Sequence, residues 1–272
     1  MNSENTVGID AKVLYEELER FFQPDAYRDM AANGLLADHA ETIYKVYTAT
    51  FSSDQVIAQL RERSASDCLL FTHHPGAQHP ENMPPVYFSK ETLQYMEQNR
   101  ISHYSLHLPM DQINPYSPGI SFAKVLGLTP YDRFFEEGGA VMGLFCTGSF
   151  DTCSQVLQKI ESVVGHACRL YRYGEELLCD GRVALIAGGA EGTAFYDALR
   201  DAGIGLLITG VGTREADWFA PSHKAAEAAG VSILAAGHYS TESFALMEMC
   251  RFFRQRGVEA AFLPETPLLQ DL

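Results

Sequence analysis

The sequence predicts an α/β fold, because short apolar strands alternate with amphipathic helices along most of the 272 residues. Three of the predicted strands end in, or are soon followed by, histidines or acidic residues, in the stretches 73–74, 107–111 and 238–242. The carboxyl ends of strands are where α/β folds commonly place their ligands. We therefore expect the functional groups at the ends of strands.

The first half of the chain is predicted to form alternating helices and strands that end near Leu126. Amphipathic spacing, capping residues and Pro24 delimit the helices, and apolar runs delimit the strands. In chain order these are helix Val13–Phe22, strand Ile43–Ala49, helix Gln55–Ser64, strand Cys68–Phe71, helix Ser89–Asn99, strand Ile101–Leu108 and helix Ile120–Leu126.

The second half repeats the alternation after a polar, glycine-bearing run, Gly127–Gly143, which is typical of a domain connection. The final helix is expected to have Thr241 as its cap and Glu242 in its first turn. The other predicted elements are a helix within Ser149–Val164, strands Leu170–Tyr173, Val183–Ala187 and Gly205–Thr209, helix Ser222–Ala229 and strand Val231–Ala236.

A glycine turn joins a strand to a helix at Ile186–Thr193. This turn suits an anion at a helix N-terminus, or it simply reverses the chain tightly. Its glycine spacing differs from the dinucleotide fingerprint, so a nucleotide-dependent oxidoreductase would lack its usual motif.

Composition and charge exclude several classes of protein. The formal net charge of −15 argues against a broad surface for nucleic acid or anionic membrane. No apolar stretch is long enough to span a bilayer, and residues 1–12 lack the pattern of a signal peptide. The six cysteines are scattered without a CxxC pair, which argues against a disulfide framework or zinc ribbon. We expect a cytoplasmic protein.

Six side chains at the three strand ends have the chemistry of metal ligands: His73 and His74, His107 and Asp111, and His238 and Glu242. Four imidazoles and two carboxylates suit Zn, Mn, Fe or Ni rather than Ca or Mg. Six ligands exceed the need of one tetrahedral zinc, whereas two bridged ions would use them all.

Local geometry bears on how these ligands could meet. A bend at Pro109 could bring His107 and Asp111 to the same strand end. Neighbouring side chains alternate across a strand, so His73 and His74 could each serve a different ion. No partner at suggestive spacing exists for His39, His79, His103 or His166, and His223 is ambiguous.

The chain carries three motifs, in the order Thr72-His73-His74-Pro75, His107-x-x-x-Asp111 and Gly237-His238-Tyr239-Ser240-Thr241-Glu242. Together they resemble the Nif-three-like dinuclear metal-centre family, whose members are often described as GTP cyclohydrolase I type 2 homologs. Asn33-Gly34-Leu35 and Ile208-Thr209-Gly210 resemble two further family segments. The resemblance covers essentially the whole chain and is to the short form of the family. One departure is Val211, where the family commonly has Glu.

The resemblance implies a subunit of two related α/β lobes with mixed sheets flanked by helices, assembled as a homohexamer. With the connection above, it predicts lobes at residues 1–130 and 131–272, with about 231–272 able to pack back on the first lobe. It implies two divalent metal ions per chain (Zn, Fe, Mn or Ni), with the ligands His73, His74, His107, Asp111, His238 and Glu242.

The function implied is a dinuclear metal-dependent hydrolase, GTP cyclohydrolase-like, that uses a metal-activated water. Asp111 or Glu242 would bridge the ions or move a proton, and the small-molecule substrate could be a purine nucleotide. The alternative is a non-enzymatic metal-binding oligomeric scaffold, which a fully coordinated metal pair would favour.

Overall fold

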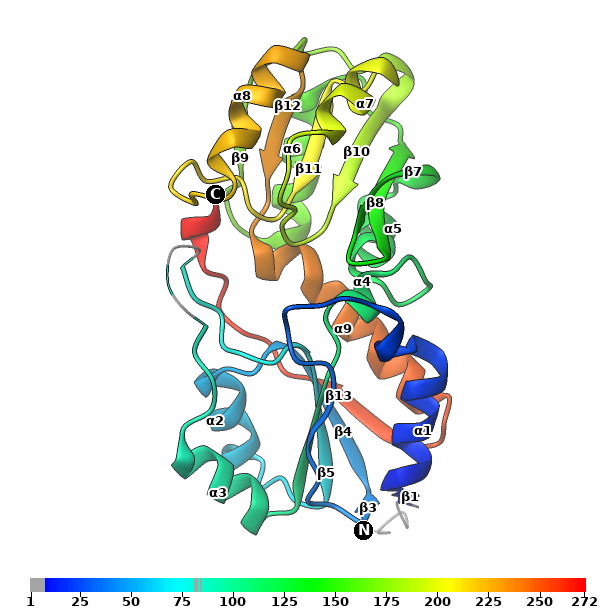
Figure 1. Cartoon of the computed structure of the whole chain (residues 1–272), viewed down its shortest axis with the longest axis vertical. Helices are drawn as coiled ribbons and strands as arrows, with labels where there is room; N and C mark the ends of the chain where they lie inside the picture. The colour runs from blue at the N-terminus through cyan, green and yellow to red at the C-terminus, as the bar shows by residue number, and fades with distance from the viewer. Residues whose placement is uncertain (1–7, 81–82, 84) are drawn as a thin grey trace. The chain divides into compact units, whose positions relative to one another are not determined.

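The computed structural model describes residues 8–80, 83 and 85–272, which form two compact units, each an α/β sheet flanked by helices (Figure 1). Unit 1 contains residues 8–78, 85–110 and 245–266, and unit 2 contains the other described residues. Unit 1 is thus made of two early segments, the second of which ends at Met110, and of a third segment from late in the chain. The predicted lobe limits, 1–130 and 131–272, stay a prediction.

Unit 1 is built on a five-stranded sheet in the order β13-β4-β5-β6-β2. The first four strands are parallel and β2 is antiparallel to β6. A two-stranded pair, β1 with β3, stands beside it. The strands are β1 (Ile9–Asp10), β2 (Gly34–Ala37), β3 (Thr42–Ile43), β4 (Lys45–Phe51), β5 (Cys68–His74), β6 (Ile101–Ser105) and β13 (Glu259–Phe262).

Helices cover both faces of this sheet (Figure 1). Helices α2 (Asp54–Glu62) and α3 (Lys90–Gln98) pack on one face through a buried apolar cluster that includes Leu60, Leu70 and Met96. Helices α1 (Ala11–Phe22) and α9 (His238–Arg254) meet the other, where the ring of Phe71 contacts that of Phe253. Alternate residues of β5 therefore serve the two faces.

Most sequence predictions for unit 1 are confirmed, but β1 and β2 were not predicted, and β3 and β4 were predicted as one strand. Strand β5 continues through His74, and β6 ends at Ser105, so that a short helix α4 (Leu108–Asp111) replaces the predicted end of the strand. Strand β13 was not predicted. Ser53 and Ser89 cap α2 and α3 through their hydroxyl oxygens.

Unit 2 is built on a six-stranded mixed sheet in the order β7-β8-β10-β11-β12-β9, with β10, β11 and β12 parallel. Helices α5 and α6 bury one face of the sheet in an apolar core. The elements are α5 (Pro118–Leu126), β7 (Thr129–Glu137), β8 (Ala140–Thr147), α6 (Cys153–Val164), β9 (Arg169–Tyr171), β10 (Arg182–Ile186), α7 (Phe195–Asp201), β11 (Leu206–Thr209), α8 (Ala220–Ala229) and β12 (Ser232–Ala235).

Two predictions for unit 2 are wrong. The expected connection at 127–143 is the β7–β8 hairpin, closed by Gly138 and Gly139 at positive φ. Strand β7 is at an edge of the sheet and largely exposed, so it carries the polar residues of a linker. Helix α9 begins at His238, so Thr241 is inside the helix and does not cap it.

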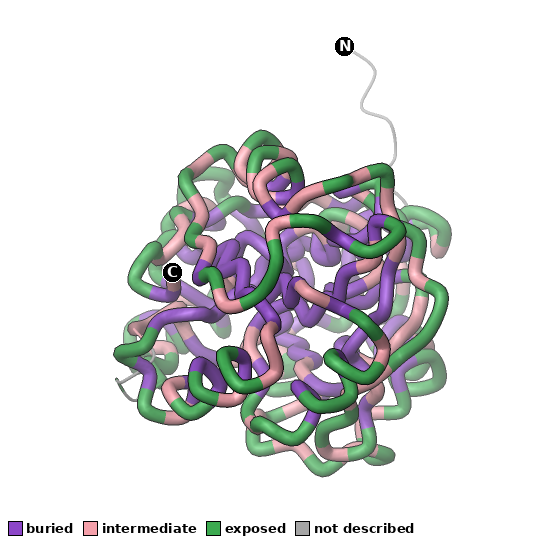
Figure 2. Tube along the Cα trace, turned by 90° about the horizontal axis from the view of Figure 1, so that it is seen from above, coloured by how far each residue is buried: buried purple, intermediate pink, exposed green. Residues whose placement is uncertain are grey.

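Both sheets present parallel strands whose ends carry the predicted ligands. Strands β5, β6 and β12 are almost wholly buried, and Figure 2 shows buried residues gathered in the interior with exposed residues around them. Three single-turn 3-10 helices lie at Pro24–Ala26, Cys179–Gly181 and Leu269–Asp271. Among the described residues, no helix combines the length and apolarity needed to cross a membrane.

Candidate metal centre

Three histidines gather at the carboxyl ends of β5 and β6 in unit 1. One ring nitrogen each of His73, His74 and His107 lies within 4.8 Å of the others, which is close enough to hold one metal ion. The ring centroids are 4.5 Å apart for His73 and His74, and 5.0 Å apart for His74 and His107. The expectation that His73 and His74 each serve a different ion stays a prediction. We call these three residues the histidine set.

Hydrogen bonds and ring stacking orient two members of the histidine set. The Nδ1 atom of His73 is 2.8 Å from the carbonyl oxygen of Leu106. Because a carbonyl only accepts, Nδ1 carries the proton and Nε2 keeps its lone pair for a metal. The ring of His74 stacks on that of Phe51 at 4.4 Å and 8°. The neutral tautomer that binds metal is thus fixed in His73.

Asp29 orients His107 and was not predicted from the sequence. Its carboxylate lies 3.0 Å from Nδ1 of His107 and also accepts hydrogen bonds from the backbone N–H groups of Ala31 and Leu108. Burial raises the pKa of Asp29, but the hydrogen bonds from His107 and its neighbours outweigh this and hold the pKa well below its usual range. A carboxylate on the far nitrogen is the arrangement typical of metal-binding histidines.

Asn33 completes this support. Its side-chain oxygen accepts a hydrogen bond from the backbone N–H of His107 at 2.7 Å, and its amide nitrogen donates to Asp29 at 2.8 Å. The Asn33-Gly34-Leu35 motif was the one sequence signal that pointed to this segment. Asp29 itself stands in irregular backbone, without a pattern that could have revealed it.

In unit 2, Glu242 lies close to His238 and to Asp111, and we call these three residues the acidic set. Since α9 begins at His238, residues 238 and 242 are one helical turn apart on the same face. Nε2 of His238 is 3.1 Å from Oε1 of Glu242. Ligands of one tetrahedral ion at about 2.1 Å are separated by roughly 3.4 Å, so this spacing suits a shared metal.

Glu242 is the central member of the acidic set. A carboxylate oxygen of Glu242 lies within 4.8 Å of one from Asp111, and both side chains are buried. Carboxylates this close repel each other when both are ionised, and a bound cation relieves that repulsion.

Gly188, at the end of β10, leaves room for the acidic set. A Cβ atom there would lie 2.2 Å from Oε1 of Glu242, and Gly188 has a φ of +68°. Its backbone N–H donates to the hydroxyl of Thr241 at 2.9 Å. Thr241 therefore ties the glycine turn to α9. The turn packs closely on the acidic set, and α7 begins well after it, at Phe195.

The remaining histidines serve other purposes. His103 is buried and lies 2.9 Å from the Thr72 hydroxyl, and burial lowers its pKa to about 4. His166 contacts the hydroxyl of Ser240. His223 is buried and hydrogen-bonds to the carbonyl of Gly212 and to the hydroxyl of Tyr173. His79 lies 2.9 Å from the carbonyl of Pro80. Among the described residues, none of these four belongs to a group that could hold a metal.

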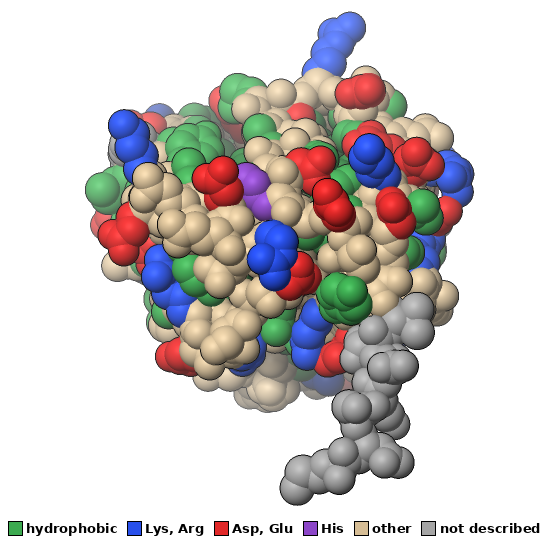
Figure 3. Space-filling model, turned by 90° about the horizontal axis from the view of Figure 1, so that it is seen from below, with side chains coloured by type: hydrophobic (Ala, Val, Ile, Leu, Met, Phe, Trp, Pro, Cys, Tyr) green, Lys and Arg blue, Asp and Glu red, His purple; other side chains and the backbone are tan. Residues whose placement is uncertain are grey.

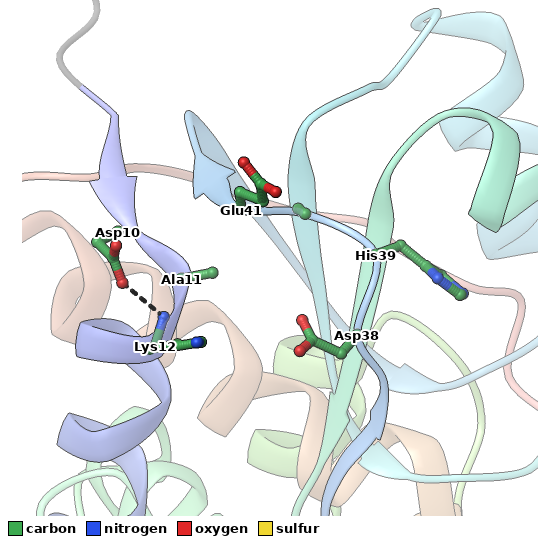
Figure 4. A pocket seen from close by; sticks show the side chains of 7 residues that line it. Asp10, Ala11, Lys12, Asp38, His39 and Glu41 are labelled. Atoms are coloured by element: carbon green, nitrogen blue, oxygen red, sulfur yellow. Dashed lines mark hydrogen bonds between the residues drawn. The ribbon is translucent and has the colours of Figure 1, made fainter.

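A separate hollow of about 440 Å³ opens near the start of α1 in unit 1 (Figure 4). It is polar, with Asp10, Lys12, Asp38, His39 and Glu41 among its lining residues. Asp10 is occupied in capping α1, because its carboxylate accepts from the N–H of Lys12 at 2.9 Å. On the face drawn in Figure 3, acidic and basic side chains are interspersed. In the described part of the chain, no candidate metal group includes residues of this hollow.

Comparison with known proteins identifies the family to which the chain belongs. A model of the family described as Duf34/NIF3 (NGG1p interacting factor 3) matches residues 9–267. A relative from Borreliella burgdorferi, named GTP cyclohydrolase 1 type 2 homolog, is 28% identical over 258 residues, covering 94% of this chain and 98% of the relative. One of the same name from Archaeoglobus fulgidus is 26% identical over 252 residues, covering 90% and 94%.

Solved structures share the fold. The protein ybgI, described as of unknown function, superposes with a TM-score of 0.78 at 21% identity, covering 96% of this chain and 100% of that one. TTHA1606 from Thermus thermophilus gives 0.73 at 23% identity, covering 95% and 99%. Reduced HcgD from Methanocaldococcus jannaschii gives 0.73 at 22% identity, covering 96% and 100%. At these identities the likeness confirms the mixed α/β fold alone.

Proposed function

The chain belongs to the Duf34/NIF3 family, and from that premise we propose that it is a metal-dependent hydrolase that acts on a small molecule. The observation that carries the proposal is the histidine set with His107 held by Asp29. A histidine that only fills a core does not need a carboxylate hydrogen-bonded to one ring nitrogen while the other ring nitrogen keeps its lone pair. The names of the relatives make GTP the first substrate to test.

We further propose that the histidine set and the acidic set supply the six protein ligands of two divalent ions, Zn, Fe, Mn or Ni. Their donor types fit these metals, and six ligands are more than one catalytic ion takes. When bound, two such ions lower the pKa of a water molecule and polarise the bond to be cleaved.

The residues of the acidic set take different roles in this proposal. Glu242 is close to both Asp111 and His238, so it is the better placed to bridge two ions. Asp111 would be the ligand less engaged by metal, so its buried carboxylate would be the one to hold or move a proton. His73 and His107 act as neutral ligands through Nε2.

A hydrolysis assay on the full chain tests the proposal. Opening the guanine five-membered ring of GTP releases its C8 carbon as formate, which can be measured with the protein loaded with each metal in turn. Glu242→Gln should lower the rate by roughly a hundredfold or more. Glu227→Gln, on the exposed side of α8, should leave it unchanged. Metal-loaded protein that releases neither formate nor phosphate from any nucleotide would favour the scaffold instead.

Assembly and location follow the family resemblance. We propose a cytoplasmic homohexamer that binds a small molecule, with no role in membrane or nucleic-acid binding. Light scattering after gel filtration measures the mass directly. A mass close to six chains of 30.1 kDa is expected, and a monomer would contradict the assembly.

A further inference from the structure

Two arginines lie on one tyrosine ring at an edge of the sheet of unit 2. The guanidinium carbon of Arg169 is 4.9 Å from the centre of the Tyr171 ring, and that of Arg214 is 5.7 Å from it. Tyr171 is buried and both arginines are exposed. We call Arg169 and Arg214 the arginine pair.

Both guanidinium groups of the arginine pair are exposed to solvent. Elsewhere, exposed arginines such as Arg100 and Arg200 form ion pairs with neighbouring carboxylates. Within the described part of the chain, neither member of the arginine pair forms an ion pair. In a chain of net charge −15, two exposed cations that both contact the Tyr171 ring offer N–H donors to an anion.

A directed chain of hydrogen bonds holds Arg214. His223 donates from Nε2 to the carbonyl of Gly212 at 2.9 Å, since a carbonyl only accepts. Its Nδ1 must therefore accept, and the Tyr173 hydroxyl donates to it at 2.9 Å. The hydroxyl oxygen in turn accepts from Nη2 of Arg214 at 2.5 Å. The guanidinium group is thus positioned before any ligand arrives, which lowers the entropy cost of binding.

Arg169 of the arginine pair lies beside the end of β12, the strand that leads to His238 of the acidic set. Arg169 is paired with Ala235, the last residue of β12, and His238 follows three residues later. The backbone N–H of Gly212 donates to the carbonyl of Asp271, whose carboxylate accepts from the N–H of His238.

We propose that Arg169 and Arg214 bind a phosphate group of the substrate. Guanidinium groups match phosphate oxygens with paired N–H donors, and Lys at the same place would supply only a point charge. This inference rests on the proposed function and names its substrate class: a phosphorylated small molecule, such as a nucleotide, rather than a neutral nucleoside or cyclic amide. Tyr173 is a positioning residue for Arg214.

Calorimetric titration of the full chain with pyrophosphate, GTP and guanosine tests this inference. Arg169→Ala and Arg214→Ala should each weaken binding of pyrophosphate and GTP by roughly ten- to a hundredfold, from the loss of charge-assisted hydrogen bonds. Binding of guanosine should be the same in all variants. Arg200→Ala is the matched control, because Arg200 is exposed in the same unit but ion-paired with Asp197, and it should bind like the wild type.

The metal content of each variant, measured before titration, separates this inference from the proposed function. Protein without metal that still binds pyrophosphate through the arginine pair would support the phosphate site whether or not the hydrolase is correct. Equal affinity of the wild type and the double alanine variant would overturn the phosphate site, as would a wild type that binds no pyrophosphate at millimolar concentration. If the alanine variants lost pyrophosphate binding only when they also lost their metal, the phosphate site would be overturned as well. If the double alanine variant does not fold, Arg169→Lys with Arg214→Lys replaces it, and unchanged affinity there counts against the paired donors.

Discussion

Asp29→Asn should weaken metal binding by the histidine set more than it weakens the fold. One carboxylate oxygen of Asp29 accepts hydrogen bonds from the N–H of Leu108 and from the amide of Asn33, both at 2.8 Å. An amide nitrogen in that place cannot accept either bond. The variant also loses the negative charge that faces Nδ1 of His107 at 3.0 Å.

This geometry predicts a loss of stability and a separate loss of metal affinity. Two hydrogen bonds of about 1 kcal/mol each predict a free energy of unfolding lower by about 2 kcal/mol. Replacing the carboxylate beside the His107 ring by an amide predicts a metal affinity lower by about 10- to 100-fold, which is the usual effect of removing the group that orients a ligand.

Competition with a chromophoric chelator measures the affinity, and thermal unfolding of the metal-free chain measures the stability. Asp25→Asn is the control, because Asp25 is an exposed carboxylate of the same segment; it should change neither quantity. If Asp29→Asn bound metal as tightly as the wild type while folded, Asp29 would have no role in orienting His107, and the argument from its hydrogen bonds would fail.

Three further predictions concern stability and the ligand sets. Burial raises the pKa of Glu265 from 4.5 to about 7, so the folded chain retains a proton that the unfolded chain loses. The contribution of this proton to stability is complete below pH 4.5 and is lost as the pH rises through 7. At pH 8 the free energy of unfolding of Glu265→Gln should therefore exceed that of the wild type by up to about 3 kcal/mol. Denaturant titrations in which the two proteins depend on pH in parallel would refute this. Gly188→Ala should displace Glu242 and reduce bound metal, because the new Cβ would lie 2.2 Å from its Oε1; full metal content by elemental analysis would show that the close approach is unimportant. His79→Ala should retain all its metal, and a loss would mean that the ligand sets are incomplete.

The histidine set could be predicted because its residues follow buried strands. Residues 68–71 are apolar and Pro75 limits the strand, so His73 and His74 were expected at a sheet edge. Their convergence was not predictable from strand alternation. It depends on the backbone at the end of β5 and on the packing of His74 against Phe51.

The parts that could not be predicted depend on contacts between distant segments. Asp29 meets His107 only after folding, across 78 residues of sequence. Thr241 has the composition of a helix cap, but it accepts from the N–H of Gly188 instead, which lies 53 residues away. Strand β7 resembles a linker because an exposed edge strand needs few apolar residues.

Metal-to-chain stoichiometry, by elemental analysis of untagged protein purified without chelator, tests the central claim most directly. We expect about two ions per chain, falling on substitution of His107 by Ala. Absence of stoichiometric metal, even after reconstitution with Zn, Mn, Fe and Ni, would contradict both the two-ion centre and the hydrolase.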